Sequence, residues 1–491
     1  MKYLLGIDFG GGASKATLLR EDGEICATCT TEYSTNYPKP GYAEQNPDDW
    51  VSATCENIKG VLEKSKVAPS DICAVALDAA THTAVIMDES FNVIRPAIYW
   101  TDTRSVTEVA YLKENYSEII DKQVLHKADT IWSLPELMWI KNNEPQNWAK
   151  VKKIMFAKDY VRHCLTGDYV TDYIEAEGSM MFDINTMMWS KELCGILGIS
   201  TDMMPEIVKP ADIVGSITEN AAKITGLSVG TPVLCGTTDT VMEVFASGAV
   251  KKGQMTLKLA TAGRICVVTD KPYPDINLIN YSHIIDGHFY PGTATKSCAA
   301  SYRWFRDTFG EDYKELDEKA KSVPIGSEGL VFHPYLNGEL TPYANPALCA
   351  DFVGVRASHT KAHFTRAVLE GVAMSMLDCK TTLDNLNIPH AESAAIIGGG
   401  GKSPLWRQMV SDALGIKLVE MKYADSSFGS AMLAGIAVGV FENAQKAVEK
   451  CNKVVSETIP VAENTAKYRE LFKKYKAIQR ALEPIYNGEY L

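Results

Sequence analysis

Hydrophobic and polar positions follow similar patterns in the two halves of the chain. Each half opens with two short apolar segments on either side of a turn of small residues, which is the pattern of a β-hairpin. The strands predicted in the first half are residues 2–9 and 15–19, and those in the second half are residues 254–259 and 265–269. Each half therefore begins with a predicted hairpin.

A region with helical periodicity follows each hairpin. A polar cap precedes an apolar-periodic run at Pro47–Lys64, and Lys361–Leu386 is a longer periodic run. The last such segment, Thr465 to Leu482, is basic and amphipathic, and we expect a solvated closing helix there. Hairpins followed by alternating strands and helices predict an α/β fold with mixed sheets covered by helices. The remaining strands are predicted at Ile25–Glu32, Ile72–Leu77, Val233–Cys235, Ala394–Ile397 and Lys417–Glu420.

The length of the chain, 491 residues, predicts two domains, because a single core rarely grows beyond ~250–300 residues. We place the join near Ser247–Lys252, which gives an N-terminal domain of residues 1–247 and a C-terminal domain of residues 248–491. The chain has 49 basic and 61 acidic residues and a net charge of −12. This excess of acid argues against a surface for nucleic acid or anionic membrane.

The N-terminus and the cysteines indicate a cytoplasmic protein. Met1 and Lys2 lead directly into the first predicted strand, with no apolar segment typical of a signal peptide. No stretch reaches the length of a membrane span. The twelve cysteines are scattered, and the only close pair, Cys26 and Cys29, lies in a predicted strand where the two side chains would point to opposite faces. We therefore expect reduced thiols.

The turn of the first hairpin is a candidate phosphate and magnesium site. Gly10, Gly11 and Gly12 follow a strand that carries Asp8 near its end. Glycines let the backbone turn tightly and expose its N–H groups, which bind phosphate oxygens in a concave turn. A neighbouring carboxylate can hold a divalent cation through water. The alternative is an ordinary hairpin turn, and this segment alone does not decide between them.

Three more turns carry candidate chemistry. Asp239 follows a buried strand, which places it at the carboxyl end of that strand, although Asp is also a preferred helix N-cap. The turn Ala260–Gly263 can bind a second phosphate or serve only as a hairpin turn. Four glycines, 398–401, separate a strand from a helix that starts near Pro404. Because successive glycines cost conformational entropy, we favour an anion or nucleotide site there over a structural turn.

Two segments in the first half can contact a polyol. Thr81 and His82 follow a predicted strand, and the histidine can hydrogen-bond a ligand hydroxyl or be purely structural. Trp100, Asp102 and Arg104 offer an aromatic wall, an acceptor and a donor. The alternative for the second segment is a surface turn with a salt bridge.

In this order and spacing the motifs resemble the FGGY family of carbohydrate kinases, most closely its xylulokinase-like branch. The resemblance covers nearly the whole chain, and its strongest part is residues 350–370, which fits the second family signature in full. Other matching stretches are residues 6–10, 41–50, 95–104, 158–167 and 398–408.

The resemblance implies two actin-like (ribonuclease H-like) domains with mixed sheets flanked by helices and an interdomain cleft. It also implies ATP-dependent phosphorylation of a ketopentose such as D-xylulose, or of a related sugar or polyol, with ATP and Mg²⁺ as cofactors. Asp239 would be the general base, and Asp8 would position magnesium and the acceptor. We expect no nucleic-acid or membrane partner, and a homodimer is the assembly that general frequencies favour. The implied sugar contacts are Thr81, His82, Trp100, Asp102 and Asp239. The implied ATP contacts are Gly10, Gly11, Gly12, Ser14, Lys15, Ala260, Thr261, Ala262, Gly263, Gly398, Gly399, Gly400 and Ser403.

The chain departs from the family pattern around the phosphates. Gly11 and Gly12 stand where the family carries Thr or Ser, so the hydroxyl groups of the loop are missing, and Ser14 is the nearest hydroxyl along the chain. Thr240 stands where the family carries Asn or Gln. These departures keep a second hypothesis open, that of a catalytically weak relative that binds a sugar or a nucleotide.

Overall fold

The computed structural model describes residues 1–489 and divides into two compact units. Unit 1 contains Met1–Val250, Tyr281–Gly287 and Tyr423–Asn452, and unit 2 contains the rest of the chain. The C-terminal half thus returns to unit 1 twice. Each unit is built on its own mixed β-sheet, as the alternation of strands and helices predicts.

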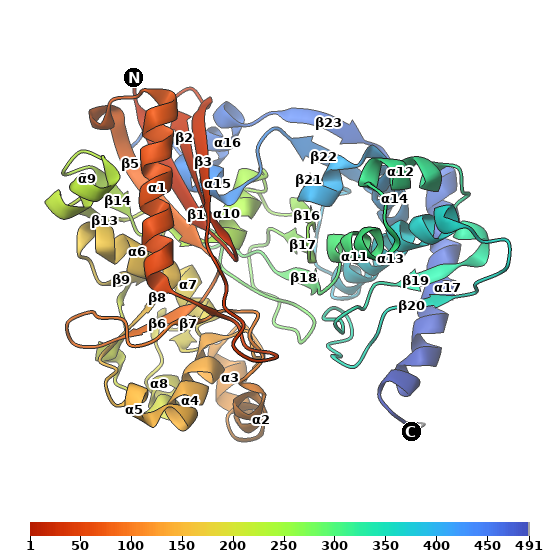
Figure 1. Cartoon of the computed structure of the whole chain (residues 1–491), viewed down its shortest axis with the longest axis horizontal. Coiled ribbons are helices and arrows are strands. Elements are labelled where there is room, and N and C mark those ends of the chain that lie inside the picture. The colour runs from red at the N-terminus through yellow and green to blue at the C-terminus, as the bar shows by residue number, and fades with distance from the viewer. Residues whose placement is uncertain (490–491) are drawn as a thin grey trace. The chain divides into compact units, whose positions relative to one another are not determined.

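The main sheet of unit 1 has seven strands in the order β13-β14-β5-β1-β2-β3, with β15 also paired to β5 (Figure 1). Strands β1, β2 and β3 form an antiparallel meander, and β5 runs parallel to β1, β14 and β15. The predicted first hairpin is therefore present. The strands are β1 (Tyr3–Phe9), β2 (Ala13–Arg20), β3 (Ile25–Glu32), β5 (Ile72–Ala79), β13 (Ile213–Ser216), β14 (Pro232–Leu234) and β15 (Thr237–Thr238).

The two faces of this sheet are covered by different helices. Helix α1 (Pro47–Ser65) packs on the face that carries Phe9, and the rings of Phe9 and Trp50 stack at 6.2 Å. Helix α15 (Ser426–Ala437) packs on the other face, where the Thr17 and Ser427 hydroxyls lie 2.7 Å apart. Because side chains alternate along a strand, Asp8 lies on the α15 face. Helix α15 comes from the C-terminal half, so the sequence pattern alone did not place it beside β1.

The rest of unit 1 consists of short helices and strand pairs around this sheet. Its helices are α2 (Val106–Asn115), α3 (Ser117–Gln123), α4 (Ser133–Asn143), α5 (Pro145–Trp148), α6 (Ala157–Thr166), α7 (Tyr173–Gly178), α8 (Lys191–Leu197), α9 (Glu219–Thr225), α10 (Asp239–Ala246) and α16 (Ala444–Cys451). Its strand pairs are β4 (Glu44–Gln45) with β7 (Ala97–Ile98), β6 (Ala84–Met87) with β8 (Lys153–Phe156), β9 (Val170–Asp172) with β12 (Glu206–Val208), and β10 (Phe182–Asp183) with β11 (Met188–Trp189).

Unit 2 contains a six-stranded sheet in the order β18-β17-β16-β21-β22-β23. The predicted second hairpin is its β16–β17 pair, and β16, β21 and β22 run parallel. A separate pair is formed by β19 (Val331–His333) and β20 (Asp351–Val353). The strands of the main sheet are β16 (Met255–Leu259), β17 (Gly263–Val267), β18 (Gly292–Thr295), β21 (Ser393–Ile397), β22 (Lys417–Met421) and β23 (Val454–Thr458).

The expectation of a solvated closing helix at the end of the chain is corrected by the structure of unit 2. The last helix, α17 (Ala462–Tyr486), is not simply solvated, because Tyr468 and Tyr475 are fully buried in the core of unit 2. An aromatic side chain every seven residues gives this helix an apolar stripe within its charged sequence. The other helices are α11 (Ala299–Phe309), α12 (Tyr313–Lys321), α13 (Lys361–Asn385) and α14 (Pro404–Leu414).

Two further observations bear on the sequence predictions. All twelve cysteines have free thiols, and Cys26 and Cys29 lie in β3 as expected. Among the helices of residues 1–489, none combines the length and the apolar character that a bilayer span requires.

Candidate active site

Three aspartates lie at the carboxyl ends of neighbouring parallel strands in unit 1. Asp8 is near the end of β1 and pairs in register with Asp78 of β5. Strand β15 runs parallel to β5 on its other side, with Thr237 opposite Asp78, and Asp239 follows directly as the first residue of α10. The N-cap position of α10 is Thr238, so the interpretation of Asp239 as a helix cap is wrong. Parallel strands thus bring the three carboxyl groups to one edge of the sheet, where ligands of α/β folds bind.

Burial and mutual repulsion control the protonation of this cluster. The pKa of Asp8 is raised to about 7, chiefly by burial and then by the negative charge of Asp239. The pKa of Asp78 is raised well above its ordinary value by burial and by Asp8. A hydrogen bond joins the two side chains, and it lowers the pKa of Asp8 while raising that of Asp78. Burial and mutual repulsion therefore disfavour the state in which both carboxyl groups are ionised.

Asp239 is held by two threonine hydroxyls. The Thr81 hydroxyl donates to Oδ1 of Asp239 at 3.4 Å, and the Thr240 hydroxyl donates to the same oxygen at 3.2 Å. Asp239 is half-buried, in contrast to the fully buried Asp78. The threonine that departs from the family pattern at position 240 thus orients the carboxylate of its neighbour.

His82 lies buried beside this cluster as a neutral imidazole. Burial lowers its pKa to about 3, and its ring packs 4.8 Å from the ring of Trp132. Its backbone has a φ of 54°, and its N–H donates to the Glu175 carboxylate. The ring nitrogen Nδ1 is buried without a hydrogen-bond partner among the described residues. A buried polar atom without a partner is costly, and a ligand hydroxyl would satisfy it.

The second predicted sugar segment is organised around a buried ion pair. Oδ2 of Asp102 accepts hydrogen bonds from Ala43 N–H at 2.6 Å and from the Arg104 guanidinium at 2.7 Å. Asp102 is only 1% exposed, so the salt-bridge alternative is correct but the pair is internal. Trp100, by contrast, is 40% exposed, and the next residue, Thr101, lines a hollow together with residues 37–43. Asp102 therefore fixes the loop at Ala43, and Trp100 supplies the accessible surface.

The backbone of the first glycine turn is anchored through its carbonyl groups. The Gly11 carbonyl accepts from the Thr35 hydroxyl at 2.8 Å and from the Gln45 amide at 2.9 Å. Tyr33 bonds both ends of the turn, its N–H to the Gly12 carbonyl at 3.0 Å and its hydroxyl to the Gly10 carbonyl. Within residues 1–489 the N–H groups of Gly11 and Gly12 have no bonded acceptor. This arrangement leaves them available to phosphate oxygens.

Ser14 and Lys15, which follow the glycine turn, lie on opposite faces of the sheet. Ser14 pairs directly with Phe9, so it lies on the α1 face of the sheet, and it is fully buried. Asp8 lies on the opposite face, and a contact of Ser14 with the ATP phosphates stays a prediction. Lys15 pairs with Asp8 on the α15 face and forms a 3.2 Å ion pair with Asp425.

The two predicted nucleotide turns of unit 2 lie beside each other. A Cβ atom on Gly398 would come within 2.6 Å of the Leu259 carbonyl oxygen, and the φ of Gly398 is +89°, so only glycine fits there. The parallel pairing of β16 with β21 brings Gly398–Gly400 next to Ala260–Gly263. Within the turn Ala260–Gly263, the carbonyl groups of Ala260 and Thr261 accept hydrogen bonds from backbone N–H groups at the start of α11. The N–H of Gly263 donates to the hydroxyl of Thr295.

Ser403 has a structural role. It is the N-cap of α14, its oxygen accepts from Trp406 N–H at 3.2 Å, and its hydroxyl donates to Asp317 at 2.6 Å. A contact between Ser403 and ATP stays a prediction.

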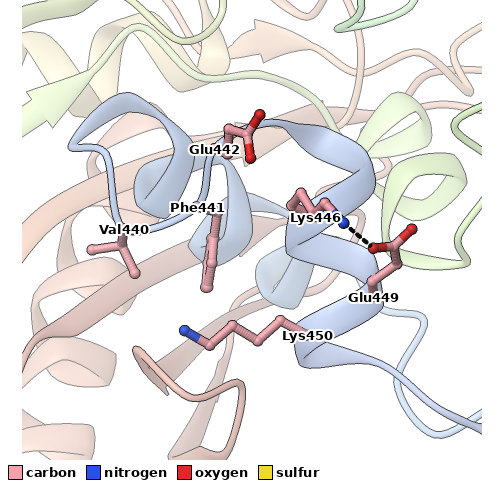
Figure 2. A pocket seen from close by; sticks show the side chains of 6 residues that line it. All are labelled: Val440, Phe441, Glu442, Lys446, Glu449 and Lys450. Atoms are coloured by element: carbon pink, nitrogen blue, oxygen red, sulfur yellow. Dashed lines mark hydrogen bonds and ion pairs between the residues drawn. The ribbon is translucent and has the colours of Figure 1, made fainter.

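Two other residues of the aspartate cluster, Asp78 and Ser430, were not predicted as site residues from the sequence. Asp78 begins the motif that contains Thr81 and His82, and its place one strand over from Asp8 is visible only from the sheet order. Ser430 of α15 donates to Asp78 at 2.5 Å. A hollow beside α16 contains none of the predicted residues. Its lining includes the Lys446–Glu449 ion pair, and the Lys450 ammonium lies 5.6 Å from the centre of the Phe441 ring (Figure 2).

Comparisons with known proteins show the family to which the chain belongs. The N-terminal domain of the FGGY family of carbohydrate kinases matches residues 3–246, and the C-terminal domain of that family matches residues 235–438. The xylulose kinase of Bacillus subtilis (strain 168) is 31% identical over 483 residues, which are 97% of this chain and 97% of that protein. The sequence resemblance is thus confirmed.

Solved structures confirm the fold class. A ligand-bound xylulose kinase from Lactobacillus acidophilus has a TM-score of 0.94 at 25% identity, covering 99% of this chain and 100% of that one. A gluconate kinase from the same organism has a TM-score of 0.93 at 25% identity, with 99% of each chain covered. The fold is therefore the two-domain actin-like α/β fold that the sequence predicts.

Proposed function

Because the chain belongs to the FGGY family of carbohydrate kinases, we propose that it transfers the terminal phosphoryl group of ATP to a hydroxyl of a ketopentose. Among the ketopentoses, D-xylulose is the first candidate for the acceptor. The class of enzyme, a kinase acting on a sugar hydroxyl, follows from the family. The choice of D-xylulose rests on the similarity to xylulose kinases along the whole chain.

The observation that carries the proposal is the placement of Asp239. It stands half-buried at the carboxyl edge of the sheet, with Oδ1 held by the hydroxyls of Thr81 and Thr240. A general base must be held within hydrogen-bond reach of the proton that it removes. We assign Asp239 this role: it accepts the proton of the acceptor hydroxyl as that oxygen attacks phosphorus.

Asp8 is our candidate for the magnesium site. Its Oδ1 is buried without a hydrogen-bond partner, and a hard carboxylate oxygen suits Mg²⁺. Among the described residues no group of three metal-ligating side chains forms a cage. A single carboxylate, that of Asp8, fits a cation whose other ligands are waters and substrate phosphates, which is the usual arrangement for Mg²⁺. When bound, Mg²⁺ would neutralise charge on the phosphates.

Backbone N–H groups supply the remaining phosphate contacts in this proposal. In unit 1 these are the N–H groups of Gly11 and Gly12, whose carbonyls are anchored on the protein side. In unit 2 the adjacent turns at Ala260–Gly263 and Gly398–Gly400 would contact the nucleotide. Phosphoryl transfer depends on positioning and charge stabilisation, which such fixed donors provide.

His82 and Trp100 are the sugar contacts best supported by geometry. The neutral His82 ring offers a buried nitrogen without a partner, and Trp100 offers an exposed aromatic surface. A direct sugar contact by Asp102 stays a prediction, as do a homodimer and a cytoplasmic location.

The test is the release of ADP from Mg²⁺-ATP over a panel that includes D-xylulose, other ketopentoses, gluconate and sugar alcohols. A single acceptor that raises ADP release far above the acceptor-free rate, with Asp239→Asn inactive, would support the proposal. If every acceptor left the rate at background while calorimetry still detected a bound ligand, the chain would be a sugar- or nucleotide-binding relative.

A further inference from the structure

The hydroxyl of Tyr99 occupies the space that a side chain on Gly11 would fill. A Cβ atom placed on Gly11 would lie 2.7 Å from Oη of Tyr99 and 3.4 Å from its Cζ. The first distance is too short for any side chain unless Tyr99 moves, and the second is an ordinary van der Waals contact. The φ of Gly11 lies outside the left-handed region, so its backbone conformation is open to other residues. A single oxygen atom therefore keeps position 11 a glycine.

Tyr99 reaches this position from the end of β7 and is held there rigidly. Its N–H donates to the Ala43 carbonyl at 2.9 Å, and its ring packs with Ala43 and Ala80 in a small buried cluster. Ala80 N–H in turn donates to the Phe9 carbonyl at 3.1 Å, immediately before the glycine turn. Tyr99 as a whole is 7% exposed. A tyrosine packed in this way presents its hydroxyl with little freedom to move.

The phenol is prepared as a hydrogen-bond donor. A phenol can donate one hydrogen bond through its own proton. Burial is the main cause that raises the pKa of Tyr99, and the charges of Asp239 and Asp8 raise it further. Tyr99 thus remains protonated at any working pH and lies within the field of both carboxylates.

We propose that the Tyr99 hydroxyl donates a hydrogen bond to the transferring phosphoryl group and replaces the hydroxyl that the Gly10–Gly12 turn lacks. This inference rests on the proposed function, since it assigns a contact within the same site. The oxygen lies 2.7 Å from the point at which a Thr or Ser at position 11 would place its Cβ atom. Charge on the equatorial phosphoryl oxygens is stabilised by such fixed donors. In this proposal the hydroxyl donor comes from Tyr99, at the end of β7, and not from the turn after β1.

The test is a double-mutant cycle on positions 99 and 11. Tyr99→Phe removes only the oxygen, and we expect kcat to fall about 100-fold, the usual effect of losing one donor to developing charge. Gly11→Thr alone should also lower kcat, because its Cβ meets the Tyr99 oxygen. In the double variant that oxygen is gone and the introduced threonine supplies a hydroxyl, so we expect at least a tenfold recovery over Tyr99→Phe.

Binding measurements separate this inference from the proposed function. Tyr99→Phe should weaken the binding of a non-hydrolysable ATP analogue and leave ADP binding unchanged, as calorimetry would show. Tyr160→Phe is the matched control, because its hydroxyl bonds Asp48 between α6 and α1 and should not affect either ligand.

The outcomes are distinct. If the wild type forms no ADP with any acceptor, the proposed function fails, while the comparison of analogue with ADP still decides the role of Tyr99. An unchanged kcat and unchanged analogue binding in Tyr99→Phe would overturn the inference. So would additive losses in the double variant, because the introduced threonine hydroxyl would then not substitute for that of Tyr99.

Discussion

Asp8 and Asp78 occupy matching positions on the adjacent parallel strands β1 and β5, and burial raises the pKa of both carboxyl groups. Helix α15 closes over this pair, with Ser430 bonding Asp78 and Ser426 bonding Asp8. Two buried carboxyl groups this close cannot both ionise. The pair therefore resists double ionisation, and the carboxyl group of Asp8 titrates at about 7.

Asp239→Asn should abolish most turnover and preserve the fold. The amide keeps the size of the side chain and an oxygen for the Thr81 and Thr240 hydroxyls, but it cannot accept a proton. General-base catalysis contributes ~10²–10⁴-fold, so we expect kcat to fall by about that factor. Steady-state kinetics with the preferred acceptor measures kcat, and calorimetry and thermal melting should show unchanged acceptor binding and stability. Turnover near the wild-type level would rule out Asp239 as the base.

The raised pKa of Asp8 predicts an acid limb in the activity profile. The carboxylate must be ionised to hold a cation, and its pKa in the free protein is about 7. We therefore expect kcat/KM to rise with pH through about 7, since this ratio reports ionisations of the free enzyme. Asp78→Asn keeps a hydrogen-bond donor to Asp8 and should leave this limb in place. Asp78→Ala removes the bond that lowers the pKa of Asp8 and should move the limb to higher pH.

The same shift predicts how stability changes with pH. The pKa of Asp8 is raised in the folded protein above its ordinary value of 3.8, so folding favours the protonated form. This contribution to stability is complete below pH ~4 and is lost as the pH rises through about 7. Asp8→Asn removes the titrating group, and its melting temperature should decline less between pH 5 and 8 than that of the wild type. Parallel declines in both proteins would contradict the assignment.

The sequence predicted the elements well because both hairpins and the long helices are strongly periodic. Residues 2–9 and 254–259 alternate or run apolar as buried strands do, and β1 and β16 begin within one residue of the prediction. The position of Asp239 after a buried strand was also readable. Sheet order was not readable in this way: Asp78 and Asp8 are neighbours only because β5 pairs with β1.

Side-chain direction was also hard to predict from the sequence. Ser14 is close to the glycine turn along the chain, but strand alternation turns it to the α1 face, away from Asp8. Tyr99 is far from the turn along the chain, yet its hydroxyl reaches Gly11. Contacts of this kind depend on tertiary packing, which local patterns do not encode.

His82 should determine acceptor affinity without titrating in the working range. Burial lowers its pKa to about 3, so the imidazole stays neutral between pH 5 and 8. His82→Asn tolerates the positive φ of 54° at this position but withdraws the ring nitrogen from the acceptor. We expect the acceptor KM to rise about tenfold, the loss of one hydrogen bond, with the ATP KM unchanged. Equal changes in both KM values would point to a structural role instead.

Glu177 should hold the segment Tyr281–Gly287 onto unit 1 in a pH-dependent manner. Ser282 donates to this carboxyl group twice, from its N–H at 2.8 Å and from its hydroxyl at 2.5 Å. Burial raises the pKa of Glu177 to about 8, well above its ordinary value of 4.5. Burial favours the protonated form in the folded protein and outweighs the two Ser282 bonds, which favour the ionised form, so the net contribution to stability is lost as the pH rises through about 8.

Hydrogen exchange at the Ser282 amide tests this coupling directly, because that N–H is itself bonded to Glu177. In the wild type we expect its protection factor, corrected for intrinsic exchange, to fall between pH 7 and 9. Glu177→Gln supplies a neutral acceptor of the same shape and should keep the protection while removing its pH dependence. Glu177→Ala leaves both Ser282 donors without their acceptor and should lower protection about tenfold at every pH, as loss of a buried hydrogen bond does. If Glu177→Ala matched the wild type, other contacts would have to hold the segment, such as the bond from the Tyr173 hydroxyl to the His283 carbonyl at 3.2 Å.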